Sequence, residues 1–263
     1  MLPKLSATQF IKRMTSGRTC PILCGCVDQN DQAVGEYVVK LLGNRDGPAS
    51  GALFEFVGSR LARQFGILVP EPAAVGIDPS FAEAIIELKP ELSGPVRASI
   101  GFNFGSKVVS PMTTWLVGRS IPDAMWRDAV NIFAFDDLIQ NPDRRVDNPN
   151  LFTKGDEIYI YDHETSFSFL YALVHSATPW VVEGEAYGYL DKHVFYARLK
   201  SKEIDLSDFL ERLNALTVEI FTTIRTELPE EWMDVKLQQI EAHLLGVRDH
   251  SNEFIEGVRR RLA

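Results

Sequence analysis

The sequence predicts an α+β protein with two lobes. We expect a small N-terminal lobe with a short antiparallel sheet and one helix, followed by a mainly helical C-terminal lobe. Short apolar runs separated by turn residues fill the first ninety residues, whereas apolar residues at helical spacing dominate the remainder. A stretch with proline and glycine at residues 89–95 separates the two patterns. We therefore expect the lobes to comprise residues 1–90 and 91–263.

The composition is typical of a globular protein and narrows the classes of partner. Of 263 residues, 45% are hydrophobic and 24% are charged. The net charge of −9 would repel a polyanionic backbone, so we expect no direct nucleic-acid binding. No apolar run is long enough to span a membrane, and the N-terminus lacks a signal-peptide core. We therefore expect no membrane partner.

The three cysteines cluster near the start of the chain, at Cys20, Cys24 and Cys26. An odd, clustered set of cysteines indicates a reducing compartment, so we expect a cytoplasmic location. No nearby histidine supplies a fourth zinc ligand. We interpret these cysteines as small residues packed in a strand and turn.

Two strands joined by a polar turn are predicted early in the N-terminal lobe. We expect the strands at residues 21–24 and 36–42 and the turn at residues 28–31. Lys40 lies between apolar neighbours, so an inward-pointing ammonium there needs an acidic partner. Glu55 is the acidic residue of the next predicted helix and is the natural partner. The alternative is an exposed Lys40 and a solvated Glu55.

One helix and two more strands complete this predicted lobe. Apolar residues at helical spacing predict the helix over residues 51–65, with Ser50 as its N-cap. Gly66 follows in the position that commonly ends a helix. We expect the two strands at residues 74–77 and 83–88.

The C-terminal lobe is predicted to be helical around one hairpin. A nearly continuous apolar stripe predicts a helix over residues 123–138, which leads directly into the polar loop 141–148. Two short apolar runs around a turn predict a hairpin over residues 151–161. Longer amphipathic helices are expected at residues 204–226 and 230–263, separated by Pro229.

The loop and the hairpin carry three polar residues that suit phosphoryl transfer. Asp143 is followed by Asn148 five residues later and by Asp162 nineteen residues later. Asp143 could orient an acceptor hydroxyl, while Asn148 and Asp162 offer the oxygen ligands that magnesium prefers. Phosphoryl transfer depends mainly on positioning and charge neutralisation, so these residues together with Lys40 suffice chemically. The alternative for residues 141–143 (Asn-Pro-Asp) is an ordinary Asx turn at Asn141, and residues 148–150 (Asn-Pro-Asn) could form another.

At these residues the chain resembles the HipA-like kinases, a family with a protein-kinase-like fold related to phosphoinositide kinases. The residues that carry the resemblance are Tyr37–Lys40, the helix from Glu55 to Gly66 with Ile67–Pro70 after it, Asn141, Asp143, Asn148, Asp162 and Leu228–Trp232. The resemblance implies a bilobed fold that binds ATP and Mg²⁺ in the cleft between the lobes.

The resemblance also implies a role for each candidate residue. Lys40 would bind phosphate, Glu55 would orient Lys40, and Asp143 would be the catalytic acceptor of the hydroxyl proton. Asn148 and Asp162 would bind the metal. The implied reaction transfers the γ-phosphate of ATP to a serine or threonine hydroxyl of a protein substrate, and an antitoxin or accessory chain is a further implied partner.

The chain also departs from the family pattern. Arg145 stands where the family usually has histidine, residues 24–36 contain no glycine-rich phosphate loop, and the extra N-terminal subdomain of full-length HipA proteins is missing. These departures keep two alternatives open. One is a pseudokinase or nucleotide-binding interaction module, and the other is a kinase that acts on a lipid or small-molecule hydroxyl.

Overall fold

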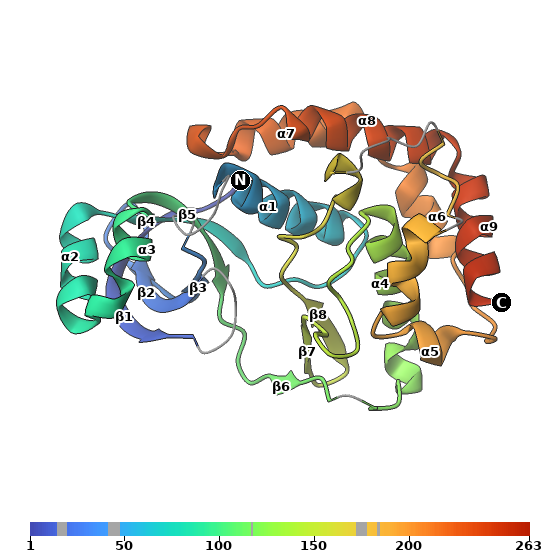
Figure 1. Cartoon of the computed structure of the whole chain (residues 1–263), viewed down its shortest axis with the longest axis horizontal. Coiled ribbons are helices and arrows are strands. Elements are labelled where there is room, and N and C mark those ends of the chain that lie inside the picture. Colours follow the sequence, from blue (N-terminus) through green and yellow to red (C-terminus); the bar gives the residue numbers. More distant parts are fainter. Residues whose placement is uncertain (15–19, 42–47, 117, 172–177, 183–184) are drawn as a thin grey trace. The chain divides into compact units, whose positions relative to one another are not determined.

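The structure, a computed structural model, describes residues 1–14, 20–41, 48–116, 118–171, 178–182 and 185–263. It contains both helices and strands, which confirms the α+β prediction (Figure 1). The chain forms two compact units. The first consists of Met1–Phe56, Pro70–Ser110 and Arg225–Asp234, and the second of Val57–Val69, Pro111–Ile224 and Val235–Ala263.

Five strands of the first unit close into a barrel in the order β1-β2-β3-β5-β4. The strands are Lys4–Arg13 (β1), Ile22–Val27 (β2), Ala33–Val39 (β3), Pro72–Ile77 (β4) and Gly101–Lys107 (β5). We expected a small antiparallel sheet. The closure is instead parallel, because Lys4–Ser6 of β1 pairs with Ala74–Gly76 of β4. The other strand pairs are antiparallel, as expected.

The interior of the barrel contains two of the three cysteines. Cys24 and Cys26 lie on the same face of β2 and are buried as free thiols. Burial raises the pKa of each thiol to about 12, so both stay protonated at neutral pH. Their role in packing is therefore confirmed. The turn after β2 is also confirmed, because the Asp28 carboxylate accepts the backbone N–H groups of Asn30 and Gln32.

Residues 83–88 are helical, so the strand predicted there is wrong. They belong to α2, Pro79–Leu88. The Asp78 carboxylate accepts the backbone N–H of Phe81 at 2.8 Å, and Pro79 occupies the first turn, where its missing N–H is tolerated. Phe81 and Ile85 then fall on one helical face and pack into the barrel core.

The first unit continues beyond residue 90, where we expected the boundary between lobes. The stretch predicted as a linker forms the 3₁₀ helix η2, Pro90–Leu92, and the helix α3, Ser93–Arg97. Leu92 and Val96 are buried in the barrel core. The next strand, β5, pairs with β3 and β4. These pairings hold the chain in the first unit as far as Ser110.

The helix that carries Glu55 is confirmed, with an earlier start than predicted. It is α1, Pro48–Gln64. Ser50 is not its N-cap but lies inside the first turn, where its hydroxyl donates to the Asp234 carboxylate at 2.9 Å. Gly66 has a φ of +71° and ends the helix as predicted.

The predicted helix and hairpin of the second unit are both confirmed. The helix is α4, Asp123–Leu138, and the hairpin consists of β7, Leu151–Lys154, and β8, Glu157–Ile160. A short strand, β6 (Thr113–Thr114), pairs with β7 to complete a three-stranded sheet. The φ of +60° at Gly155 permits the tight turn between β7 and β8.

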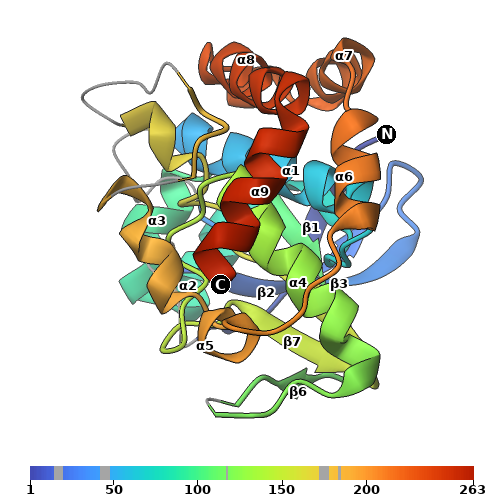
Figure 2. The same cartoon turned by 90° about the vertical axis from the view of Figure 1, so that its right-hand side faces the viewer.

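The two long helices predicted near the end of the chain are each divided into shorter ones. The observed elements are α6 (Ser207–Asn214), α7 (Val218–Glu227), η5 (Glu230–Trp232), α8 (Lys236–Asp249) and α9 (Ser251–Leu262). The elements between the hairpin and α6 are η3 (Ser168–Tyr171), η4 (Glu185–Lys192) and α5 (Tyr196–Leu199). Within the second unit α6 packs against α8 and α9 (Figure 2).

Aromatic contacts connect α4 with the helices around it. The Phe65 ring lies 5.7 Å from that of Phe135 in α4 and 4.6 Å from that of Phe209 in α6. Phe209 in turn contacts Phe254 of α9 at 6.4 Å. These buried rings hold the end of α4, from which the loop at residues 141–148 departs.

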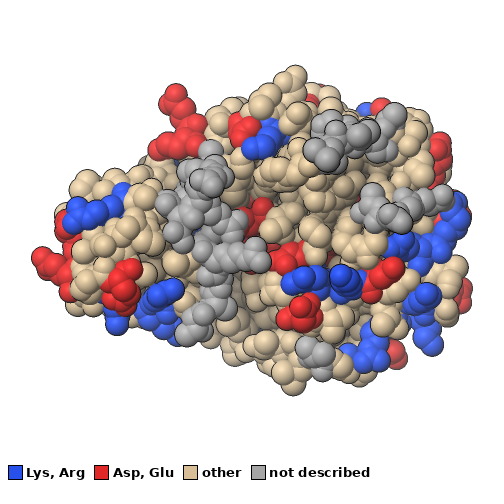
Figure 3. Space-filling model, viewed as in Figure 1, with Lys and Arg blue, Asp and Glu red and all other residues tan. Residues whose placement is uncertain are grey.

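Basic and acidic side chains are interspersed on the face drawn in Figure 3, as the mixed composition predicts. Within the described parts of the chain, no helix combines the length and apolar character needed to cross a membrane.

The barrel predicts a strong response to one added methyl group. A Cβ at Gly105 in β5 would lie 2.5 Å from Cγ2 of the buried, β-branched Val75. Gly105→Ala should therefore lower the free energy of unfolding by about 1–3 kcal/mol, measured by urea denaturation. Gly94→Ala in α3 is the matched control, because nothing lies within 4 Å of its added Cβ. Equal losses in both variants would contradict the predicted clash.

Candidate functional site

The polar loop begins with a turn that folds back on α4. The Asn141 backbone N–H donates to the carbonyl of Asp136 at 2.8 Å. Its side-chain amide donates to the Asp136 carboxylate at 2.9 Å. The Asn141 Oδ1 atom accepts the backbone N–H of Asp143 at 3.1 Å. Asn141 therefore does form the Asx turn considered above, and this turn fixes the backbone of Asp143 relative to α4.

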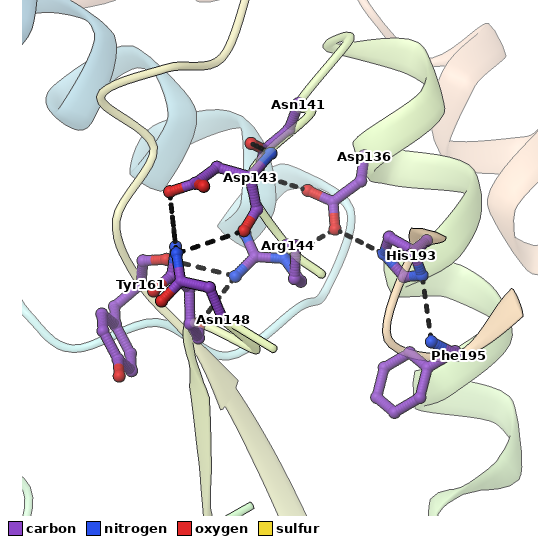
Figure 4. Close-up of polar contacts among 9 residues, drawn as sticks. Asp136, Asn141, Asp143, Arg144, Asn148, Tyr161, His193 and Phe195 are labelled. Carbon is purple, nitrogen blue, oxygen red and sulfur yellow. Dashed lines mark hydrogen bonds and ion pairs between the residues drawn. The ribbon is translucent and has the colours of Figure 1, made fainter. Parts of the chain in front are cut away.

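Arg144 fastens the loop to the hairpin. Its side chain is fully buried, and Nε donates to the Asp136 carboxylate at 2.6 Å. Its Nη1 donates to the carbonyl of Asn150 at 2.6 Å and to the carbonyl of Tyr161 at 3.1 Å (Figure 4). One guanidinium therefore connects the end of α4 with the start of β7 and the end of β8.

Electrostatics keep Asp136 ionised inside this network. Burial alone would raise the pKa of Asp136, but the charge of Arg144 and the hydrogen bonds from His193 and Arg144 outweigh it and lower the pKa to about 2. An unfolded aspartate titrates near pH 3.9. The stabilising contribution of Asp136 is therefore complete above about pH 4 and is lost as the pH falls towards 2.

His193 completes the network from a distant segment. Its Nδ1 accepts the backbone N–H of Phe195 at 3.2 Å, so the ring proton of the neutral imidazole must be on Nε2. Nε2 lies 3.0 Å from the Asp136 carboxylate and donates to it (Figure 4). Burial lowers the pKa of His193 despite the attraction of Asp136, so this histidine is a neutral donor at pH 7.

Asp143 and Asn148, predicted to act together, are in direct contact. The Asn148 amide donates to Oδ2 of Asp143 at 2.9 Å and to its carbonyl at 3.4 Å. A second amide, that of Asn150, donates to the same Oδ2 at 3.2 Å. The sequence interpretation had considered Asn150 only as part of a possible turn. Its hydrogen bond depends on a left-handed backbone, with φ +47°, that residue spacing does not reveal.

Asp162 directly follows Tyr161, whose backbone is held by hydrogen bonds to Asn150 and Arg144. The backbone N–H of Tyr161 donates to the carbonyl of Asn150 at 3.0 Å, and the Tyr161 carbonyl accepts from Arg144. Asp162 itself has a φ of +62°, a conformation that non-glycine residues seldom adopt and that concentrates at functional sites. The loop and the residue before Asp162 are thus joined by three hydrogen bonds through Asn150 and Arg144.

His163, after Asp162, is a packing residue. It is fully buried, and its ring lies 6.3 Å from that of Phe135 in an edge-to-face arrangement. A Cβ at Gly58 would come within 2.6 Å of the His163 side chain. Glycine at this position therefore lets α1 approach the segment after Asp162 closely.

Lys40 and Glu55 form an ion pair within the first unit. Lys40 follows β3, and its backbone N–H donates to the carbonyl of Phe104 at 2.9 Å. The Lys40 side chain is 16% exposed and that of Glu55 only 2%, so neither is the solvated surface residue of the alternative interpretation. A buried pair of this kind is held firmly, because removing either partner leaves an uncompensated charge.

Arg145 occupies the loop position where histidine was expected. Its guanidinium lies 3.7 Å from Oδ1 of Asp143 and 3.4 Å from the Asp147 carboxylate, and its side chain is 39% exposed. A half-exposed cation therefore stands beside the proposed acceptor of the hydroxyl proton.

Comparison with known proteins identifies the family. The family model for HipA-like kinases matches residues 7–254, so the chain belongs to the HipA-like kinase family and the predicted resemblance is confirmed. A solved structure of a Helicobacter pylori proinflammatory kinase, CtkA, has a similar fold, with a TM-score of 0.50 and 13% sequence identity. The match covers 100% of this chain and 99% of that one. Among curated proteins, no sequence matches.

The buried ion pair predicts a sharp contrast between two neighbouring arginines. Arg144→Met leaves the Asp136 charge buried without its main partner, so the free energy of unfolding should fall by about 3–5 kcal/mol. Arg145→Met removes ion pairs that are partly exposed to solvent and should cost less than about 1 kcal/mol. Chemical denaturation at pH 7 measures both. Similar losses for the two variants would show that Arg144 does not anchor the loop.

Proposed function

We propose that the chain is an ATP- and magnesium-dependent kinase that transfers the γ-phosphate to a serine or threonine hydroxyl of a protein. The family and the fold support a kinase. The observation that carries the finer proposal is the fixed carboxylate of Asp143, held by two amide donors in a loop that is anchored to the residue before Asp162. A pre-positioned carboxylate of this kind suits the orientation of an acceptor hydroxyl.

The donor atoms of the second unit fit a magnesium ion. The NH₂ group of Asn148 faces Asp143, which leaves its Oδ1 as the atom that would bind a cation. Asp162 would add a carboxylate, and a hard cation prefers such oxygen ligands. Bound magnesium would neutralise charge on the phosphates of the nucleotide.

The buried pair in the first unit fits phosphate binding. Glu55 restrains the Lys40 ammonium, which has no freedom to swing into solvent while the pair is intact. A restrained ammonium with residual exposure can contact a phosphate without first losing side-chain entropy. We therefore assign phosphate binding to Lys40 and its orientation to Glu55.

One observation favours a second candidate function, that of a pseudokinase or nucleotide-binding interaction module. The Arg145 guanidinium beside Oδ1 of Asp143 competes for the oxygen that would receive the hydroxyl proton. Binding of ATP with magnesium but without hydrolysis or autophosphorylation would support this candidate. Turnover by the purified chain would exclude it.

The acceptor and any accessory chain belong to the same proposal. Incubation with labelled ATP and whole-cell lysate, followed by mass spectrometry, would identify the modified molecule. A modified serine or threonine supports the protein substrate, whereas a labelled lipid or metabolite supports the alternative acceptor. An antitoxin or accessory chain would be detected in the same lysate by its co-purification with the kinase.

The role of Asp143 can be tested directly. Asp143→Asn keeps the size of the side chain but removes the charge that orients the hydroxyl. Turnover should fall by about 10³-fold or more, with ATP affinity within about threefold of the parent. Asp156→Asn, in the exposed turn between β7 and β8, is the matched control and should retain normal turnover. An Asp143→Asn variant that transfers phosphate as fast as the parent would refute the assignment.

A further inference from the structure

We propose that Asn150 is a positioning residue that determines which oxygen of Asp143 accepts the proton of the substrate hydroxyl. This inference rests on the proposed function and deepens it. The oxygen it selects is Oδ1, because Asn150 and Asn148 together occupy Oδ2.

The hydrogen bonds of Asp143 distinguish its two oxygens. Oδ2 accepts from Asn148 at 2.9 Å and from Asn150 at 3.2 Å, which uses the two lone pairs that a carboxylate oxygen offers. Among the described residues, Oδ1 has only the long ion-pair contact with Arg145, at 3.7 Å, which exceeds hydrogen-bonding distance. The Asp143 side chain is 28% exposed, so it is not closed off from an acceptor.

Asn150 is held much more firmly than its exposed neighbours in the loop. The residue is 5% exposed. Its carbonyl accepts hydrogen bonds from Arg144 at 2.6 Å and from the Tyr161 backbone at 3.0 Å. The amide that reaches Asp143 therefore starts from a backbone fixed on both sides of the hairpin.

Asn148 and Asn150 have different roles in this arrangement. Asn148 would bind the cation through Oδ1, so its amide moves when the metal site is rearranged. Asn150 is buried and its carbonyl is held by Arg144 and Tyr161, so its amide would keep Asp143 oriented before the metal arrives. Asparagine also suits the backbone, since it tolerates the left-handed φ of +47° better than most residues.

The proton and bond changes follow from this orientation. The hydroxyl oxygen of the acceptor forms a bond to the γ-phosphorus of ATP, and the bond between that phosphorus and the bridging oxygen of ADP breaks. The hydroxyl proton passes to Oδ1 of Asp143, and ADP leaves with the electron pair of the broken bond. Oδ2 remains hydrogen-bonded to the Asn150 amide throughout.

The charged groups around Asp143 define what a pH experiment would detect. Arg145 faces Oδ1 and is itself paired with Asp147. Arg144 lies behind the loop with its guanidinium on Asp136, which His193 also contacts. Asp162 follows the anchored Tyr161. A new carboxylate at position 150 would approach Asp143 from the side of Oδ2, which the amides now occupy.

The test compares Asn150→Asp with Asn150→Gly in the full chain. Asn150→Asp nearly preserves size and tolerance of the left-handed backbone, but it places two carboxylates against each other, where they compete for one proton. The acidic limb of the pH–rate profile for ATP-dependent phosphorylation should move up by about one pH unit or more. Turnover at pH 7 should fall by about 10–100-fold, with KM for ATP within about twofold of the parent.

Asn150→Gly separates orientation from charge. Glycine allows the same φ but has no side-chain amide to donate to Asp143. Turnover should therefore fall by about tenfold, and the acidic limb of the pH–rate profile should shift less than in Asn150→Asp. Thermal unfolding of both variants shows whether the fold is retained. If Asn150→Asp does not fold, Asn150→Gly decides, and parental turnover in it overturns the proposal.

The outcomes distinguish this inference from the proposed function. A parent chain that binds ATP but never transfers phosphate contradicts the kinase activity and, with it, the role of Asn150. An active parent with a pH–rate profile and turnover unchanged in both variants overturns only the role of Asn150.

Discussion

The ion pair between Asp136 and Arg144 is the interaction on which the geometry of the loop depends. Both side chains are fully buried, so the pair depends on the hydrogen bonds that their other polar atoms make. The carboxylate receives additional hydrogen bonds from Asn141 and His193, and Nη1 of the guanidinium donates to two backbone carbonyls of the hairpin. Within the described parts of the chain, Nη2 is buried without a hydrogen-bond partner. Compensation of the two buried charges thus joins α4, the loop and both ends of the hairpin around the Asp136–Arg144 pair.

A similar constraint acts in the first unit. The buried Glu55 requires a cation, and Lys40 supplies it from the end of β3. The barrel fixes that end, because β3 pairs with both β2 and β5. In each unit, the desolvation of an acidic side chain therefore restricts the position of a chemically important neighbour. Buried carboxylates that require a compensating cation therefore position the catalytic candidates, in addition to apolar packing.

The parts of the fold that were predictable have strong local signals. The apolar stripe of α4 and the Gly155 turn of the hairpin are of this kind, and both elements were predicted correctly. β1 was missed because only its first residues alternate between buried and exposed. Residues 83–88 were assigned to a strand because the adjacent Ile85 and Ile86 favour one, whereas the Asp78 cap and Pro79 impose a helix. The parallel pairing of β1 with β4 joins segments about seventy residues apart and has no local signature.

In the candidate site too, the features with a local sequence signal were predicted and the long-range contacts were not. The spacing of Asp143, Asn148 and Asp162 indicated phosphoryl transfer, and the apolar surroundings of Lys40 indicated its need for Glu55. Asp136 and His193 were not found, since their contact links residues 57 positions apart. Asn150 was overlooked because its amide reaches Asp143 only through an unusual backbone conformation.

Closure of the barrel has a consequence for how this protein behaves at high concentration. Unpaired strand edges can recruit other chains and start aggregation, and the described strands of the first unit leave no such edge. In the second unit, the outer side of β8 is covered by Leu68, which accepts the backbone N–H of Ile160 at 3.0 Å. The opposite edge, β6, is only two residues long. Barrel closure, the Leu68 contact and the shortness of β6 therefore protect both sheets against edge-to-edge association. None of these three features is a charged or proline residue at a strand edge.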